Sequence, residues 1–199
     1  MSVDSEFPRL ILASTSPRRH MLLEQIGIHF EVVPPDDGTE KTPSNGDFAA
    51  IVVRNAAAKA ASVSDRFKDR IILGADTLVE LDGYALGKPC DEADARRMLK
   101  LLSGRDHFVH TGIAVIDGRS VERYLDSEVT RVFFRRLTDD EIDDYIRSGE
   151  PMDKAGSYGI QERGAVFISR IEGCFFNVMG LPLAKLWEIL LVIKTKSTE

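Results

Sequence analysis

The sequence predicts a mixed α/β fold, because short apolar runs of strand length alternate with segments that carry an apolar stripe at helical spacing. Residues 10–13 and 70–75 are short, mostly apolar runs that end at polar or turn-forming residues, as expected of buried strands. Residues 183–191 repeat large apolar side chains at helical spacing. Two long segments at 106–116 and 120–134 have strand patterns and are joined by a turn dipeptide.

The amino-terminal half is expected to alternate between strands and helices. After the strand at 10–13, a hydroxyl-rich turn leads to Pro17, which suits the first turn of a helix, and Gly27 suits its end. A strand is expected at 29–33 and a helix from Asp47 with one apolar face. The strand at 70–75 precedes a hairpin-like segment whose turn is Asp82-Gly83.

The carboxy-terminal half is expected to continue with a helix from Asp91 to Leu102, followed by the two long strands. Thr138 and Glu141 have the spacing of a capping box, which predicts the start of a helix. A glycine-bearing loop is expected at 153–164, a strand at 165–171 and the last helix at 183–191. No repeat or linker divides the chain, so we expect one domain over residues 1–199 with its core at about 8–193.

Composition limits the classes of function. The 199 residues carry a formal charge of −6, which argues against a nucleic-acid coat protein, because such proteins neutralise many phosphates with Lys and Arg. The two cysteines are too few for a zinc knuckle or a disulfide framework. No apolar run has membrane-helix length, and residues 1–9 lack the features of a signal peptide. We therefore expect a cytoplasmic protein with neither nucleic-acid nor membrane partners.

The first candidate site is the turn that leads into the helix at Pro17. Ser14 and Ser16 lie in a strand-turn-helix segment, a geometry that points free backbone N–H groups at an anion. Arg18 and Arg19 lie near the positive end of the helix dipole, which is unfavourable unless a bound polyphosphate reverses the local charge. The alternative is that the serines cap the helix and the arginines pair with surface carboxylates.

The second candidate is Asp76, which directly follows the apolar strand at 70–75. Ligand sites of open α/β sheets lie at the carboxyl ends of the strands, where one Asp can bind Mg²⁺ or act as a general base toward water. The alternative is a turn Asp bonded to its own backbone.

Three lysines form the third candidate, a cationic cleft that would attract a polyanion to an acidic protein. Lys59 lies on the apolar stripe of its helix, Lys88 lies between Gly and Pro, and Lys154 begins the glycine-bearing loop. The alternative for Lys59 is a side chain whose stem is buried and whose ammonium reaches water.

A set of short motifs lies in order along almost the whole chain. They are LASTSPRR at 12–19, VR and KA within 53–60, GADT at 74–77, LGKP at 86–89, LSGR at 102–105, PMDKAG at 151–156, YGIQ at 158–161 and VMGLP at 178–182. Each motif alone is weak, but the ordered set resembles the Maf family of nucleoside triphosphate pyrophosphatases. The resemblance implies an elongated mixed sheet flanked by helices, two lobes around a deep cleft as in inosine triphosphatases, and a homodimer.

The resemblance also implies hydrolysis of a nucleoside triphosphate to the monophosphate and pyrophosphate with Mg²⁺ or Mn²⁺. It places Asp76 at the general base and metal position, and Ser14, Arg19, Lys59 and Lys88 at positions that handle the triphosphate, with Lys59 and Lys88 assigned to catalysis.

The positions that distinguish the dTTP- and UTP-preferring branch hold Arg18, Thr77 and Gln161 here. The family's second acidic residue, also a metal ligand, falls in a segment that contains an insertion. We assign it to Glu40, with Asp37 as the competitor.

Two other functions stay open at this stage. The chain could bind nucleotides as a regulator of cell division without catalysis, or it could hydrolyse modified purine triphosphates such as ITP. Pyrophosphate release from dTTP separates the first from an enzyme, and a substrate panel separates the second.

Overall fold

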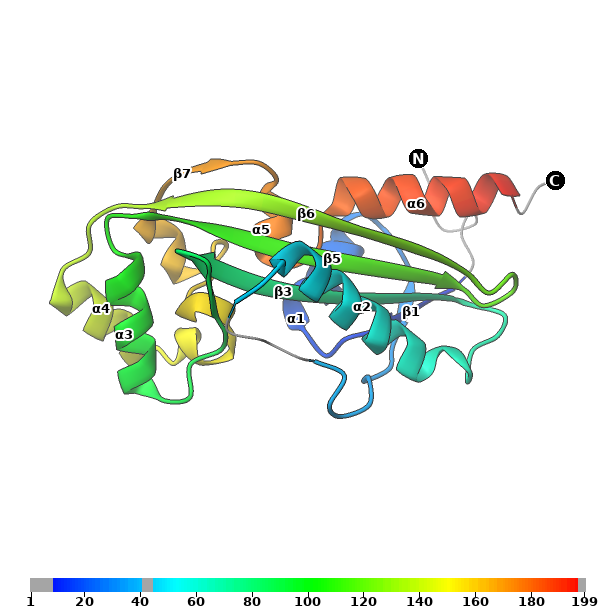
Figure 1. The fold of residues 1–199 in the computed structure, drawn as a ribbon, viewed down its shortest axis with the longest axis horizontal. Helices are drawn as coiled ribbons and strands as arrows, with labels where there is room; N and C mark the ends of the chain where they lie inside the picture. The colour runs from blue at the N-terminus through cyan, green and yellow to red at the C-terminus, as the bar shows by residue number, and fades with distance from the viewer. Residues whose placement is uncertain (1–8, 41–44, 197–199) are drawn as a thin grey trace.

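The structure is a computed structural model that describes residues 9–40 and 45–196, and within these ranges the chain forms a seven-stranded mixed sheet (Figure 1). The strand order is β2-β1-β3-β5-β6-β7, with β4 paired to β3. Strand β1 is parallel to β2 and β3, and the other pairs are antiparallel. The strands are β1 (Leu10–Ala13), β2 (Phe30–Val32), β3 (Ile71–Leu81), β4 (Tyr84–Leu86), β5 (Asp106–Asp117), β6 (Glu122–Phe134) and β7 (Ile168–Glu172).

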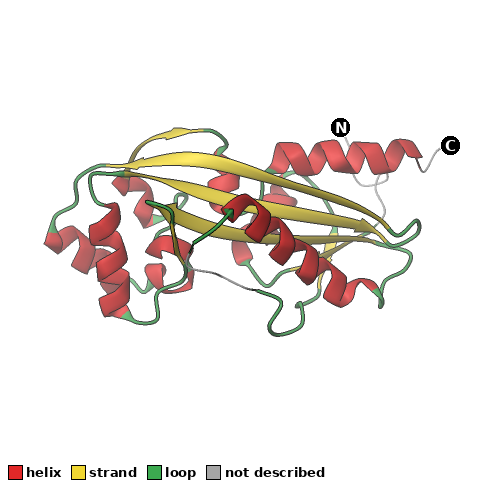
Figure 2. Cartoon of the chain, viewed as in Figure 1, coloured by secondary structure: helices red, strands yellow, loops and turns green. Residues whose placement is uncertain are grey.

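Helices cover both faces of the sheet and one of its ends (Figure 2). They are α1 (Pro17–Gln25), α2 (Phe48–Ser64), α3 (Glu92–Leu102), α4 (Asp139–Arg147), α5 (Phe175–Met179) and α6 (Leu183–Lys196). Three 3₁₀ helices follow α4, namely η1 (Glu150–Asp153), η2 (Ala155–Ser157) and η3 (Arg163–Phe167). No helix in the described ranges is long and apolar enough to cross a membrane.

The buried apolar residues divide the molecule into two lobes that share the long strands. In the first lobe, α1 and α6 pack on one face of β1, β3 and β5, while α2 packs on the other face. In the second lobe, α3 and α4 pack against the far ends of β3, β5 and β6. This arrangement confirms the expected elongated mixed sheet with flanking helices and two lobes.

Helix α2 lies unusually close to the sheet because glycines face it. A Cβ at Gly74 would stand 2.2 Å from the carbonyl oxygen of Ala56, and one at Gly112 would stand 2.4 Å from the backbone of Val52. No side chain fits at either position without moving the helix. The close approach brings the polar residues of α2 directly over the middle of β3.

Most elements match the sequence prediction, and the helices expected to start at Asp47, Asp91 and Thr138 are capped there. Asp47 and Asp91 accept hydrogen bonds from the first turns of α2 and α3, and Thr138 forms the expected capping box with Glu141. We expected the amino-terminal segment to lack the features of a signal peptide and the core to begin at about residue 8. Residues 1–8 lie outside the described part of the chain.

Three expectations about strands and helices were wrong. The strand expected to end at residue 75 continues to Leu81, because β5 pairs with it from Ile71 to Glu80 and β4 pairs with it from Val79 to Leu81. The strand expected from residue 165 begins at Ile168, since η3 occupies the preceding residues. The short helix α5 was not expected.

Candidate active site

A cavity of about 550 Å³ lies between the two lobes, and its walls come from both of them. Every residue that the sequence analysis assigned to catalysis or substrate binding lines this cavity; they are Ser14, Ser16, Arg18, Arg19, Glu40, Lys59, Asp76, Thr77, Lys88, Lys154 and Gln161. These residues are spread over nearly 150 positions of the sequence. The fold therefore brings together residues that were selected from separate motifs.

Asp76 lies within β3 and not in a turn after it, which corrects the local geometry that we expected. The parallel pairing of β1 with β3 ends at Ala13 and Gly74. Asp76 thus lies two residues beyond the last residue of β3 that pairs with β1. It still occupies the edge where α/β sheets bind ligands. The alternative of a turn Asp is excluded.

The Asp76 carboxylate is only 6% exposed and is held by two side chains from α2. Lys59 Nζ lies 2.7 Å from Oδ1, and Asn55 Nδ2 donates to Oδ2 at 2.8 Å. Lys59 is 4% exposed and also donates to the carbonyl oxygen of Ala75 at 3.2 Å. The ammonium of Lys59 is therefore buried, and the alternative of a solvated lysine is excluded.

Glu40 contacts the same lysine from the opposite side. Its Oε1 lies 2.6 Å from Lys59 Nζ, so two carboxylates converge on one ammonium. Partial burial acts to raise the pKa of Glu40, but the hydrogen bond and charge of Lys59 outweigh it and lower the pKa overall. Asp37 is exposed and does not line the cavity, which favours Glu40 as the second acidic residue.

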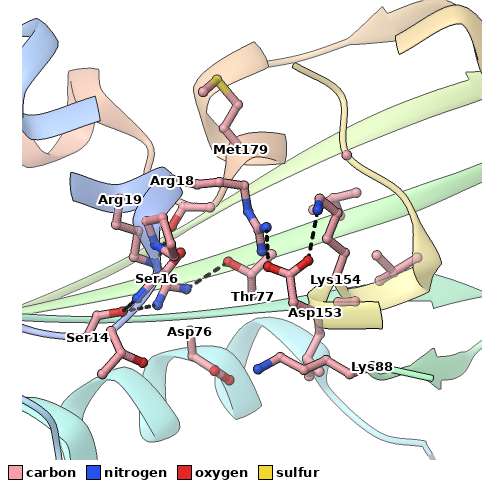
Figure 3. Close-up of a pocket in the computed structure, with 18 of the residues that line it drawn as sticks. Ser14, Ser16, Arg18, Arg19, Asp76, Thr77, Lys88, Asp153, Lys154 and Met179 are labelled. Atoms are coloured by element: carbon pink, nitrogen blue, oxygen red, sulfur yellow. Dashed lines mark hydrogen bonds and ion pairs between the residues drawn. The ribbon is translucent and has the colours of Figure 1, made fainter. Parts of the chain in front are cut away.

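Arg19 joins the turn at Ser14 to β3 on one wall of the cavity (Figure 3). It is 8% exposed, and its guanidinium donates to Ser14 Oγ at 2.9 Å, to Thr77 Oγ1 at 3.2 Å and to the carbonyl oxygen of Gly180 at 2.8 Å. Burial lowers its pKa, although an arginine remains protonated in proteins. Ser16 makes no side-chain hydrogen bond as the N-cap of α1, so the capping alternative does not account for it.

The Thr77 hydroxyl belongs to a chain of hydrogen bonds in the same wall. It accepts from Arg19 and lies 3.0 Å from the Thr111 hydroxyl, which donates to the carbonyl oxygen of Asn177 at 2.9 Å. Since Thr111 uses its proton on that carbonyl, Thr77 must donate to Thr111. Toward a ligand, Thr77 can then act only as an acceptor.

Arg18, Lys88 and Lys154 are the remaining cations of the cavity lining. Arg18 Nη1 pairs with Asp153 Oδ2 at 3.1 Å across the cavity, and Lys154 Nζ pairs with Asp153 Oδ1 at 2.8 Å and with Glu162 Oε2 at 3.0 Å. Lys88 is exposed, and it has no hydrogen-bond or ion-pair partner among residues 9–40 and 45–196. Its ammonium is thus available to an anion in the cavity.

Gln161 lines the cavity with both polar atoms of its amide buried. Neither its Oε1 nor its Nε2 has a hydrogen-bond partner among the described residues. Buried amide atoms are normally satisfied, and leaving one unpaired costs roughly 1–3 kcal/mol. The Gln161 amide is therefore an orphaned donor and acceptor side by side, which suits a planar ligand with the complementary pair.

Sequence reasoning missed two polar residues that organise the site. Asn55 received no role in the sequence analysis, although an amide four residues before Lys59 on an apolar stripe is a usable signal. Asp153 also received no role, and its contact with Arg18 joins positions 135 residues apart. No local pattern announces that contact.

Comparison with known proteins agrees with the family that the ordered sequence motifs resemble. The family model described as "Maf-like protein" matches residues 9–192. A protein of Alkaliphilus oremlandii named "dTTP/UTP pyrophosphatase" is 49% identical over 183 residues, covering 92% of this chain and 94% of that protein. A protein of the same name from Pelotomaculum thermopropionicum is 47% identical over 182 residues, covering 91% and 94%.

Among solved structures, a HAM1 protein from Coxiella burnetii matches with a TM-score of 0.48 and 19% identity, over 80% of this chain and 91% of that one. The family assignment rests on the sequence comparisons. Because the family model matches nearly all of the described residues and the relatives match over almost their whole length, this chain belongs to the Maf family.

Proposed function

We propose that this protein is a nucleoside triphosphate pyrophosphatase that hydrolyses dTTP and UTP to the monophosphate and pyrophosphate. The observation that carries the proposal is the cluster of Asp76, Lys59 and Glu40 at the floor of a cavity whose walls supply Arg19 and Lys88. A carboxylate base beside cationic groups is what attack of water on a phosphate requires. The relatives named dTTP/UTP pyrophosphatase support the same reaction.

Asp76 is the candidate base. Lys59 and Asn55 bind one oxygen each and so fix the orientation of the carboxylate, while each oxygen retains a lone pair that can accept from water. In the proposed step, a water oxygen bonds to the α-phosphorus, its proton passes to Asp76, and the bond to the bridging oxygen of the β-phosphate breaks. Pyrophosphate leaves, and the nucleoside monophosphate remains.

The triphosphate is assigned to the wall at the start of α1. Ser14 and Arg19 lie there, Ser16 offers a hydroxyl not used as a cap, and Lys88 reaches in from the other side. A helix amino terminus adds a positive dipole end that favours phosphate. We assign Lys154 a smaller role in binding, because its ammonium already contacts Asp153 and Glu162.

Asp76 and Glu40 are the residues that would hold a divalent metal. Their oxygens converge on one point, now occupied by Lys59 Nζ at 2.7 and 2.6 Å, and carboxylate oxygens are the ligands that Mg²⁺ prefers. No set of three or more acidic, His or Cys side chains suited to a metal occurs within the described ranges. Substrate phosphates and water would complete the coordination, as is usual for Mg²⁺. When bound, Mg²⁺ or Mn²⁺ would neutralise charge that develops on the phosphates.

Gln161 is the candidate for base selection. Thymine and uracil present a carbonyl acceptor beside an N3–H donor, which complements the orphaned donor and acceptor of its amide. Cytosine presents the reversed pair, and an amide that is held in place rejects it because buried polar groups stay unpaired.

Homodimerisation and a cytoplasmic location belong to the same proposal, supported by the family resemblance.

The test is pyrophosphate release with Mg²⁺ from dTTP, UTP, dCTP and ITP, with Asp76→Asn as the inactive control. We expect release from dTTP and UTP to exceed that from dCTP and ITP. A nucleotide-binding regulator would bind dTTP without releasing pyrophosphate, and an enzyme for modified purines would prefer ITP. Either result would refute the proposal.

A further inference from the structure

The loop that carries Gln161 is closed at its base by a side chain from the second lobe. Tyr145, in α4, accepts a hydrogen bond from the backbone N–H of Gly159 at 3.1 Å. A Cβ at Gly164 would stand 2.7 Å from the carbonyl oxygen of Gly159 and 2.9 Å from the Tyr145 hydroxyl. Gly159 and Gly164 therefore both lie against this hydroxyl, and residues 160–163 form the tip of a loop whose two ends are close together.

Glu150 closes the same loop from the side of η1. Its Oε1 accepts from the Tyr145 hydroxyl at 2.7 Å and from Gly164 N–H at 3.3 Å, and its Oε2 accepts from Arg163 N–H at 3.1 Å. One carboxylate thus binds two backbone amides on the carboxyl side of the loop. Through Tyr145, it is also linked to the amide on the amino side.

Burial fixes the direction of the hydrogen bonds that the Tyr145 hydroxyl makes. Tyr145 is 3% exposed, and burial together with the adjacent Glu150 carboxylate raises the pKa of its phenol. The hydroxyl therefore keeps its proton, donates it to Glu150 and accepts from Gly159. Neither Tyr145 nor Glu150 lines the cavity.

The Gln161 side chain has no partner of its own among the described residues. The place of Gln161 in the cavity therefore depends on the backbone that carries it, and that backbone is fixed at Gly159, Arg163 and Gly164. We propose that Tyr145 and Glu150 are positioning residues for base selection, which hold the Gln161 loop so that the enzyme discriminates thymine and uracil from cytosine. This inference rests on the proposed function, in which Gln161 reads the base.

The test uses Tyr145→Phe and Glu150→Gln in the full chain. The first change removes one hydroxyl and retains the ring that packs edge-on against Phe167 at 4.9 Å. The second retains the shape but replaces one acceptor oxygen with a donor, which cannot serve every partner of Glu150. The matched controls are Tyr124→Phe and Glu122→Gln, since Tyr124 also donates to a glutamate, but from β6 and outside the cavity lining.

The readout is the ratio of kcat/KM for dTTP to that for dCTP. This ratio is independent of the fraction of active protein, so a variant that is merely less stable leaves it unchanged. We expect it to fall at least about fivefold in both variants, the factor that corresponds to loss of one buried hydrogen bond, and to stay constant in both controls. Inhibition by inorganic triphosphate should not change, because Ser14, Arg19 and Lys88 are untouched.

Hydrogen exchange supplies a measurement that does not depend on activity. The amides of residues 159, 163 and 164 should exchange faster in both variants and unchanged in the controls. A wild-type enzyme without preference for dTTP over dCTP would overturn base reading by Gln161. A wild-type preference that both variants retain, or unchanged exchange in the loop, would overturn the role of Tyr145 and Glu150 and leave the proposed function standing.

Discussion

Replacing Asp76 with Asn tests the chemistry of the site most directly. The substitution preserves the size of the side chain but removes the negative charge and one acceptor oxygen. Loss of a catalytic base commonly lowers the rate about 10²–10⁴-fold. We expect a fall of this size in kcat for dTTP, because water would lose its proton acceptor while Arg19 and Lys88 still hold the phosphates.

The effect on stability follows from the contacts of Asp76. Both oxygens are bonded, to Lys59 at 2.7 Å and to Asn55 at 2.8 Å, and a hydrogen bond to a charged group contributes about 1.5–3 kcal/mol. Removing one partner of a buried ion pair costs more, about 3–5 kcal/mol, where the remaining charge has no other partner. Since Glu40 stays 2.6 Å from Lys59, we expect the free energy of unfolding to fall by about 1.5–3 kcal/mol.

The assay is steady-state release of pyrophosphate from dTTP, with urea unfolding of the same preparations. Asp153→Asn is the matched control, since Asp153 also lines the cavity and pairs with two cations but lies on the opposite wall. Its turnover should fall much less. If Asp76→Asn keeps near-full turnover while Asp153→Asn loses it, the assignment of the base is wrong.

Three further changes test the walls and the packing. Lys88→Ala should raise KM for dTTP, UTP and dCTP alike, because phosphates carry no base identity, and a change in their ranking would place Lys88 in the base pocket. Gly74→Ala should lower the free energy of unfolding by about 1–3 kcal/mol or more and reduce turnover, since its methyl group would meet Ala56 and move α2; wild-type stability in urea would contradict this. His107 is buried, and burial lowers its pKa from 6.5 to about 3. Between these pH values the folded state binds fewer protons than the unfolded state. The protein therefore loses stability as the pH falls below 6.5. From pH 7 to pH 5, the free energy of unfolding should fall by about 2 kcal/mol through this group. The variant His107→Phe should be less stable at pH 7, but its free energy of unfolding should fall less over this interval. Equal losses in the two proteins would refute the role of His107.

The sequence was informative wherever the cause of a structure is local. The capping box of Thr138 and Glu141 depends on residues three positions apart and was predicted correctly, as were the starts of the helices at Asp47 and Asp91. The end of β3 was misplaced because Asp76 interrupts the local apolar pattern, whereas pairing with β5, a long-range contact, continues the strand to Glu80.

The site was predicted in its members but not in its contacts. The ordered motifs identified the residues that line the cavity, yet no pattern placed Asn55 against Asp76, 21 residues away, or Arg18 against Asp153. Tyr145 resembles an ordinary core aromatic at the sequence level, because its apolar neighbours in α4 explain its burial. Its hydroxyl acquires a role only where the backbone of the Gln161 loop comes into contact with it.

The charges at the floor of the cavity give a physical reason for the expected divalent metal that is independent of the family. Asp76 and Glu40 share the single ammonium of Lys59, so this cluster keeps one net negative charge. A triphosphate held by Arg19 and Lys88 would bring its own negative oxygens toward that charge at the point where Asp76 has to reach the attacking water. Charges a few ångströms apart in a partly buried site interact by several kcal/mol. A bound divalent cation would offset this repulsion, because it would attract both the carboxylates and the phosphates. Asp76 and Glu40 are placed to provide its protein ligands, and Lys59 keeps both carboxylates aimed at the same point until the substrate arrives.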